Sequence, residues 1–352
     1  MQIGVDYRLA NRHLGGMAIY LKNLIRSLKM IDKQNEYVMF DDNPSGHPGF
    51  KKHAWTIVWE HIWLQLCLPY FFWKGKINLG YFPNPPVSFF LTVPIVLTIP
   101  DVSFMHDAAL PHWLKGYLWM MYFLSAHKAR TITTFSENSK KDIAAFFKVR
   151  SDKIYVIPLA GLRNSSRQKE KTKDKYVITV PGTFVPRKNI KDTILAFKKL
   201  PARIKNTHRL VIVGLTQGED FEKVKNFVAS EKMSRKTVFT GRVSDRELSR
   251  LYSGARLFIC TSLYEGFGLP VLEAMTCGTP VISYANSSLS EVVDDAGILV
   301  NDYDELSRAM QQVLDSQMLQ NILKSKGRRR AALYTWDKTA TAFITSLSKN
   351  VN

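Results

Sequence analysis

The sequence predicts an α/β protein built from two doubly wound, Rossmann-like domains with a ligand cleft between them. The chain has 352 residues, of which 45% are hydrophobic, and this length exceeds the usual size of one hydrophobic core. Short apolar runs alternate with helical patterns in two separate series, as is typical of parallel sheets with helices on both faces. A polar stretch at 162–175 separates the two series and is predicted to be the linker.

The first series predicts a domain at residues 1–165. It opens with a buried strand, Met1–Val5, and with two glycines, Gly15 and Gly16, ahead of a helix. The apolar face of that helix consists of Leu21, Leu24, Ile25 and Leu28. The other elements expected here are strands at Tyr37–Phe40, Ile77–Tyr81, Ile95–Ile99 and Thr131–Thr134 and helices at His112–Ala126 and Glu137–Phe147. A strand, a glycine turn and a helix start together favour anion binding.

The second series predicts a domain at residues 166–334. Its expected strands are Tyr176–Val180, Leu210–Val213, Val238–Phe239 and Arg256–Cys260. Its expected helices are Ile190–Leu200, Phe221–Glu231 and Asp245–Tyr252. Beyond Asn301 the pattern is helical to the end of the chain. In such sheets ligands bind beyond the carboxyl ends of the strands.

The charge of the chain favours anionic partners. Its 49 basic and 30 acidic residues give a net charge of +19, which suits nucleotide sugars, acidic lipid headgroups or nucleic acid. Cys67, Cys260 and Cys277 lie in apolar or helical contexts without metal-ligand spacing. We expect them to be buried, reduced thiols, which predicts a reducing cytoplasm.

No apolar run reaches the roughly 18 residues that a membrane-spanning helix needs. The start of the chain, with Asp6 and Arg8, does not resemble a signal peptide. The aromatic-rich run at 54–99 contains Trp55, Trp59, Trp63, Phe71, Phe72 and Trp73. It fits either a helix lying at a membrane interface or ordinary core packing, and we favour packing.

The stretch at 263–290 is predicted to be loop, helix, turn and strand. Glu265 precedes a glycine loop, Gly266-Phe267-Gly268, and Pro270 suits the first turn of a helix. Gly278 and Pro280 end that helix, which is therefore expected at 270–277. A glycine loop at a helix start presents backbone N–H groups and the positive end of the helix dipole to an anion. We predict a phosphate site.

Two carboxylates frame this site, Glu265 in the loop and Glu273 in the helix. Carboxylates repel phosphate but accept hydrogen bonds from hydroxyls. A nucleotide sugar fits this pattern, because its diphosphate lies between a ribose and a hexose. The alternative is that Glu273 merely complements the helix dipole, and a G-x-G sequence by itself is a weak indication.

The order of these residues resembles a known family. Glu265 and Glu273, with G-F-G-L-P after the first and A-M-T-C-G-T-P-V after the second, resemble the E-x7-E motif of the retaining nucleotide-sugar glycosyltransferases of family four, which have the GT-B fold. The resemblance implies that Glu273 holds the ribose hydroxyls and that Glu265 holds a hydroxyl of the donor sugar. It implies that the backbone of Gly266, Phe267, Gly268 and Leu269 contacts sugar and phosphate.

The resemblance extends to both ends of the chain. It implies that Gly15 and Gly16 approach the donor phosphates from the first domain. It also implies that the terminal segment 335–352 packs back on that domain, with Trp336 as its anchor. No cofactor is expected, since the UDP- or GDP-sugar is a substrate.

The stretch P-G-T-F-V-P-R-K-N after Val180 contains the expected cations. Arg187 and Lys188 precede a helix start, where basic side chains stabilise a leaving diphosphate. The family has a lysine matching Lys188 in this role, but often an arginine where this chain has Thr183, so Arg187 is expected to take over that function. Gly182 is assigned to the donor-binding residues. A solvated basic pair on a turn is the alternative.

The resemblance also assigns recognition of the base to the backbone around Arg242 and Val243, without distinguishing uracil from guanine. Asp302-Tyr303-Asp304 resembles the acidic D-x-D of metal-dependent glycosyltransferases. It directly precedes a helix, however, so we expect it to cap that helix. No metal is expected.

The acceptor side departs from the family pattern, because Pro100 stands where many members have a histidine before Asp101. His106 follows closely enough to substitute, although a lone histidine in an apolar loop is more often structural. The resemblance implies that the leaving phosphate helps to deprotonate the acceptor. Asp101 and His106 would then orient the acceptor rather than carry the chemistry.

The sequence therefore predicts a metal-independent retaining glycosyltransferase. It would transfer a hexose from a nucleotide sugar to a hydroxyl of a glycan or lipid-linked acceptor for cell-surface polysaccharide, in the cytoplasm or at the inner face of an anionic membrane. One alternative is a relative that binds nucleotide sugar without transferring it, motivated by Pro100 and Thr183. A nucleic-acid-binding protein is less favoured, because only the charge suggests it.

Overall fold

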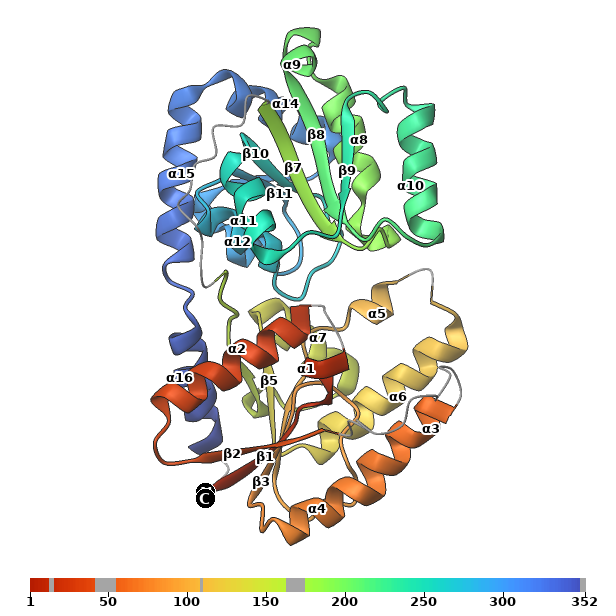
Figure 1. Ribbon diagram of the computed structural model, residues 1–352, viewed down its shortest axis with the longest axis vertical. Coiled ribbons are helices and arrows are strands. Elements are labelled where there is room, and N and C mark those ends of the chain that lie inside the picture. Colours follow the sequence, from red (N-terminus) through yellow and green to blue (C-terminus); the bar gives the residue numbers. More distant parts are fainter. Residues whose placement is uncertain (13–15, 42–54, 108–109, 163–174, 349–352) are drawn as a thin grey trace. The chain divides into compact units, whose positions relative to one another are not determined.

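The computed structural model describes residues 1–352 except 13–15, 42–54, 108–109, 163–174 and 349–352 (Figure 1). It divides into two compact units. Unit 1 consists of Met1–Phe104, Pro111–Leu159 and Trp336–Asn352, and unit 2 of Met105–Leu110 and Ala160–Thr335. Unit 2 begins before the predicted boundary at 165, because Gly161 already packs against Leu272 and Thr276. The expected linker lies almost wholly outside the described residues.

Unit 1 contains a parallel six-stranded sheet in the order β2-β1-β3-β4-β5-β6. The strands are β1 (Gln2–Asp6), β2 (Glu36–Phe40), β3 (Leu79–Phe82), β4 (Ile95–Thr98), β5 (Thr131–Thr134) and β6 (Ile154–Val156). β1 pairs with β2 on one side and with β3 on the other, so the chain reverses direction across the sheet at this point. Ligands bind beyond the carboxyl ends of strands at such a switch point.

The helical elements that begin in unit 1 are α1 (Arg8–Arg12), α2 (Gly16–Ile31), α3 (Trp55–Ile62), the π-helical turn η1 (Trp63–Cys67), α4 (Leu68–Lys74), α5 (Ser103–His106), α6 (His112–Lys128), α7 (Glu137–Phe147), η2 (Ser151–Lys153) and α16 (Trp336–Ser348). The predicted apolar face of α2 is buried. α16 packs against α2 (Figure 1), and Trp336 is buried with its ring 6.5 Å from that of Tyr20.

Unit 2 contains a second parallel six-stranded sheet, in the order β12-β11-β10-β7-β8-β9. The strands are β7 (Lys175–Gly182), β8 (His208–Gly214), β9 (Thr237–Gly241), β10 (Leu257–Cys260), β11 (Val281–Tyr284) and β12 (Ile298–Val300). β7 pairs with β8 on one side and with β10 on the other. The switch point of this sheet therefore lies between β7 and β10.

Helices cover the sheet of unit 2. They are η3 (Pro186–Lys188), α8 (Ile190–Lys199), α9 (Ala202–Thr207), α10 (Glu219–Ser230), α11 (Asp245–Gly254), α12 (Leu269–Thr276), α13 (Leu289–Val293), η4 (Asp294–Ala296), α14 (Tyr303–Asp315) and α15 (Gln317–Ala331). The core between sheet and helices includes Ile194, Phe197, Leu210, Ile212 and Leu257, each completely or almost completely buried.

Every strand and helix that the sequence predicted is present, with ends shifted by a few residues. The sequence did not reveal β6, β12, α1, α5, α9 and α13. These elements have three to six residues each, and this length is too short for a hydrophobic period to repeat. The three cysteines are free; Cys260 and Cys277 are buried as expected, whereas Cys67 is only half-buried.

Candidate functional site

The switch point of unit 2 brings together the loops that follow β7 and β10. The N–H of Leu263 donates to the carbonyl of Arg187 at 2.8 Å, and the Thr261 hydroxyl donates to the carbonyl of Asn189 at 2.9 Å. Two segments more than 70 residues apart in sequence are therefore joined through their backbones. This pairing places the predicted cations beside the first predicted carboxylate.

A buried ion pair forms the centre of the site. Lys188 Nζ lies 2.5 Å from Glu265 Oε1, and Arg187 Nη1 lies 3.7 Å from Glu265 Oε2. The side chains of Lys188 and Glu265 are only 11% and 13% exposed. Burial by itself would raise the pKa of Glu265, but the charges of Lys188 and Arg187 and the Lys188 hydrogen bond outweigh burial and lower it. Glu265 is therefore held ionised.

The turn after β11 supports the Glu265 loop through residues that the sequence analysis missed. The N–H of Glu265 donates to the Ser287 hydroxyl at 3.0 Å, and the Ser288 hydroxyl donates to the Glu265 carbonyl at 2.7 Å. The side-chain amide of Asn286 donates to the Ser262 carbonyl at 3.0 Å. The polar run Asn286-Ser287-Ser288 directly after an apolar strand was the available indication, because carboxyl ends of parallel strands meet at one edge.

The glycine loop leads into α12 as predicted, although the helix spans Leu269–Thr276 and begins one residue before Pro270. Gly268 precedes the helix with a backbone φ of +96°, which residues other than glycine rarely adopt. Phe267 is buried, and its ring lies 5.8 Å from that of Tyr334 in an edge-to-face contact. The Phe267 side chain thus anchors the loop by packing.

We expect Gly268→Ala to lower the free energy of unfolding by about 1–3 kcal/mol. A Cβ at Gly268 would lie 2.8 Å from Leu289 Cδ2, and the positive φ adds backbone strain. Gly116→Ala in α6 is the matched control, since its Cβ would meet nothing within 4 Å; there a helical alanine should stabilise by about 0.5–1 kcal/mol. Urea unfolding of both variants checks this, and equal effects would contradict it.

Glu273 lies in α12 and is 7% exposed. The Tyr252 hydroxyl of α11 donates to Glu273 Oε2 at 3.2 Å. Burial raises the pKa of Glu273 to about 7, and the charge of Asp245 adds to this, although the Tyr252 hydrogen bond opposes it. The pKa values of the two carboxylates therefore shift in opposite directions. The pKa of Glu265 is lowered by the two cations beside it, whereas the pKa of Glu273 is raised by burial.

The remaining predicted residues of unit 2 lie at strand ends. Gly182 ends β7 with φ +72°, and a cavity of about 550 Å³ opens next to it, lined by Thr183, Phe184 and the start of α10. Arg242 is exposed and Val243 half-buried after β9. Ser244 caps α11 by accepting from the N–H of Glu247 at 3.3 Å.

The D-x-D sequence caps a helix, as predicted. Asp302 accepts hydrogen bonds from the N–H groups of Asp304 and Glu305 at the start of α14, both at 2.8 Å. Among the residues that the structure describes, no group of three or more His, Cys, Asp or Glu side chains is placed to hold a metal ion.

The acceptor-side residues fall in different places. Asp101 belongs to unit 1 and accepts from the N–H of Ser103 at 2.7 Å, so it caps α5. His106 belongs to unit 2, where its ring stacks on Tyr264 with centroids 4.4 Å apart. Gly16 begins α2, and Gly15 lies outside the described residues.

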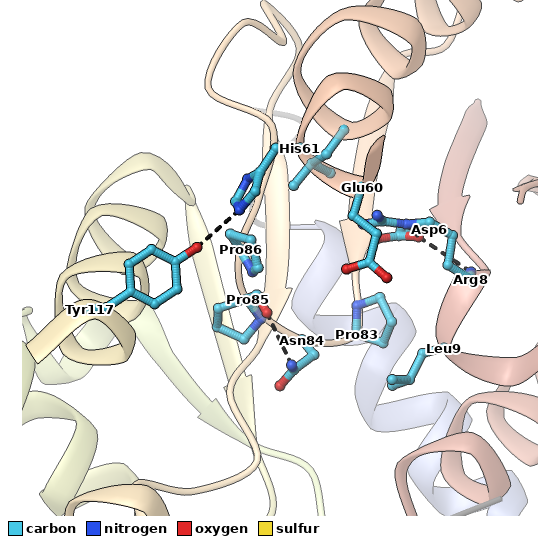
Figure 2. Close-up of a pocket in the computed structure, with 11 residues that line it drawn as sticks. Asp6, Arg8, Leu9, Glu60, His61, Pro83, Asn84, Pro85, Pro86 and Tyr117 are labelled. Atoms are coloured by element: carbon cyan, nitrogen blue, oxygen red, sulfur yellow. Dashed lines mark hydrogen bonds and ion pairs between the residues drawn. The ribbon is translucent and has the colours of Figure 1, made fainter. Parts of the chain in front are cut away.

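Unit 1 has a cavity of about 320 Å³ at its own switch point, between the ends of β1 and β3 (Figure 2). Asp6 and Arg8 line it and form an ion pair at 2.8 Å, and the guanidinium lies over the ring of Trp63. Figure 2 shows the Glu60 carboxylate and Asn84 turned toward the same space.

The other side of this cavity is formed by α3 and α6. His61 and Tyr117 meet there through a hydrogen bond of 2.9 Å between Nε2 and the hydroxyl (Figure 2). Sequence analysis missed this cavity, because its lining comes from four separate segments of the chain.

Two Rossmann-like units, each with a parallel six-stranded sheet, define the GT-B class of folds. The chain is similar in structure to sucrose-phosphate synthase from Thermosynechococcus elongatus, with a TM-score of 0.78 and 18% identity over 100% of this chain and 99% of that chain. It is also similar to HepE from Anabaena, solved in complex with UDP and glucose, with a TM-score of 0.74 and 16% identity over 99% and 100% of the two chains.

A family model described as glycosyl transferases group 1 matches residues 163–330. O-antigen chain mannosyltransferase B from Escherichia coli is 32% identical over 262 residues, which cover 71% of this chain and 68% of that protein. The chain therefore belongs to the group 1 glycosyltransferases, and the resemblance to family four is confirmed. Serotype-specific mannosyltransferase WbdA from Escherichia coli is 30% identical over 63% of this chain, which spans only 29% of WbdA.

Proposed function

We propose that this glycosyltransferase moves a hexose from a UDP- or GDP-sugar to a hydroxyl of a glycan or glycolipid in cell-surface polysaccharide synthesis, with retention of anomeric configuration. The observation that carries the proposal is the buried Lys188–Glu265 pair, with Arg187 beside it, at the switch point of unit 2. Relatives named as O-antigen and serotype-specific mannosyltransferases favour mannose as the sugar.

In the proposed complex the donor diphosphate lies at the start of α12, near Lys188 and Arg187. Glu265 accepts a hydrogen bond from the donor sugar, and Glu273 accepts from the ribose. The ionised state of Glu265 supports this role, because a carboxylate accepts hydrogen bonds but donates none. The backbone near Gly182, Arg242 and Val243 completes the donor site in this proposal.

The proposed reaction breaks the bond between the anomeric carbon and the phosphate oxygen and forms one between that carbon and the acceptor oxygen. The acceptor proton passes to the departing diphosphate on the same face of the sugar. Lys188 and Arg187 supply the positive charge that stabilises this leaving group. We therefore propose that no metal is required.

The cavity of unit 1 suits the acceptor in this proposal. Its volume of about 320 Å³ and its Asp6, Glu60 and Asn84 side chains offer oxygen acceptors to the hydroxyls of one sugar residue. Asp101 and His106 would orient the acceptor. We propose that the protein acts in the cytoplasm, at the inner face of a membrane when its acceptor is lipid-linked.

A second candidate function is nucleotide-sugar binding without transfer. Pro100 stands where the family resemblance implies a histidine in many members, and Thr183 where it often implies an arginine. Both departures motivate this alternative. Tight donor binding without release of the nucleoside diphosphate would favour this alternative.

We expect that, in a panel of UDP- and GDP-sugars, the donor that raises the melting temperature of the protein most is also the donor from which the protein slowly releases the nucleoside diphosphate in water. GDP- and UDP-mannose are the first donors to test. NMR of the glycoside formed with a mannoside acceptor should show the donor's anomeric configuration, and excess EDTA should leave the rate unchanged. No stabilisation by any donor would contradict the proposed site, and an inverted product would contradict the retaining reaction.

A further inference from the structure

One continuous helical segment of unit 1 turns large apolar side chains toward solvent. α3, η1 and α4 run on without a break, since Ile62 and Leu68 at the junctions are themselves helical. Five of its exposed apolar residues are Trp59 (46% exposed), Ile62 (39%), Leu66 (62%), Tyr70 (54%) and Trp73 (77%). They recur every three or four residues, so they form a single stripe. The packing expected for this run holds for the buried Trp63 and Phe72 but is wrong for the exposed Trp59, Phe71 and Trp73. The surroundings of the Trp55 side chain lie outside what the structure describes.

The neighbouring helix α6 has a second stripe of the same kind. Its exposed residues are Trp113 (74%), Tyr117 (38%), Met120 (45%) and Leu124 (41%), again three or four positions apart. The hydrogen bond between His61 and Tyr117 joins α3 to α6, and Figure 1 shows the two helices on the same side of the unit 1 sheet. We call these nine exposed residues of the two stripes the aromatic face.

The charges around the aromatic face are almost all positive. Glu60 is the only acidic residue in the sequence from 55 to 76, and the sequence of α6 contains none. The lysines of the same two segments are Lys74, Lys76, Lys115 and Lys128. An identical copy docked on this face would bring like charges together, whereas an anionic surface would neutralise them.

We infer that the aromatic face docks on an anionic lipid bilayer, with α3, α4 and α6 lying in the interface. None of the described helices is long and apolar enough to cross a membrane. Five of the nine residues of the face are Trp or Tyr, the side chains that sit best at headgroup level, where one end is apolar and the other wet. Lysine side chains extend from such a surface to lipid phosphates.

This inference rests on the proposed function, to which it adds the surface that holds the enzyme at the membrane. His61 and Tyr117 line the unit 1 cavity and belong to the two helices of the face. A lipid-linked acceptor held in the bilayer would therefore reach this cavity along the border of the aromatic face.

Co-sedimentation of the full chain with vesicles tests the inference without donor or acceptor. We expect binding to phosphatidylcholine vesicles that contain phosphatidylglycerol, and much weaker binding to pure phosphatidylcholine. The double variant Trp73→Ser/Trp113→Ser should bind at least tenfold more weakly. Lys74→Gln/Lys76→Gln should lose about 25-fold, or fivefold for each charge. Met318→Ser is the matched control, because Met318 is 74% exposed but lies on unit 2.

Circular dichroism and the thermal midpoint verify that each variant is folded. Donor hydrolysis is measured separately and should not change in Trp73→Ser/Trp113→Ser. Vesicle binding tests the membrane inference, and donor hydrolysis tests the proposed enzyme activity, so failure of one can be told from failure of the other. Failure of the wild-type chain to bind anionic vesicles would overturn the inference. Equal binding by the tryptophan variant, or self-association of the wild-type chain that the same substitutions abolish, would also overturn it.

Discussion

Lys188→Ala is expected to reduce donor turnover by a factor of about 10² to 10³, because it removes a cation that we propose stabilises the leaving diphosphate. It should also lower the free energy of unfolding by about 2–4 kcal/mol. Lys188 and Glu265 are both almost fully buried, and without Lys188 the Glu265 carboxylate keeps the more distant Arg187 and a hydrogen bond from Ser262. Turnover is followed as release of the nucleoside diphosphate, and stability by urea unfolding.

Two further variants separate the loss of charge from the loss of structure. Lys199→Ala removes a lysine from an ion pair with Asp304 in which both side chains are about half exposed, so its free energy of unfolding should stay close to that of the wild-type chain. The double variant Lys188→Met/Glu265→Gln removes both buried charges of the pair and leaves Arg187, which is 24% exposed and donates to the Tyr264 carbonyl at 3.1 Å. It should recover most of the stability that Lys188→Ala loses, but not turnover. Full turnover by a folded Lys188→Ala protein would refute the assignment of the leaving-group cation.

The buried Glu273 should make the stability of the unliganded protein depend on pH. Its pKa is about 7 in the folded state against 4.5 in the unfolded chain, so the folded state binds more protons between these values. The stabilising contribution of the protonated carboxyl is complete below pH 4.5 and is lost as the pH rises through 7. The loss amounts to about 3 kcal/mol.

Glu273→Gln is the isosteric control for this effect. Its amide oxygen still accepts the Tyr252 hydrogen bond but does not ionise, so its free energy of unfolding should not show this fall between pH 4.5 and pH 7. The difference between the wild-type chain and the variant, measured by urea unfolding across this range, reports Glu273 alone. Parallel pH profiles would contradict the raised pKa.

Donor binding should be coupled to the same proton. If Glu273 accepts hydrogen bonds from both ribose hydroxyls, binding favours its ionised form and releases a proton at pH 6 to about 7. The calorimetric binding enthalpy should then vary with the ionisation enthalpy of the buffer for the wild-type chain but not for Glu273→Gln.

Glu273→Ala is expected to abolish the rise in melting temperature that the best donor causes, while the fold remains intact.

The site was predictable where its residues are neighbours in sequence. Glu265, the glycine loop and the start of α12 lie within a few positions of one another, so their spacing predicted a loop and a helix start, and the family resemblance suggested their roles. Asn286, Ser287 and Ser288 could not be assigned in this way. Their role depends on the adjacency of β10 and β11, which brings the turn after β11 to the Glu265 loop.

The sequence alone determined the α/β class and the strand and helix order, because hydrophobic periods and glycine turns are local properties of the chain. The candidate donor residues came from the family resemblance of the same sequence. Only the tertiary structure decided how charges and cavities combine. The pairing of β7 with β10 brought Lys188 to Glu265, and burial beside Tyr252 set the pKa of Glu273. The tertiary structure also determined which aromatic side chains of α3, α4 and α6 face solvent, because burial depends on what packs against a helix and not on the sequence of the helix itself.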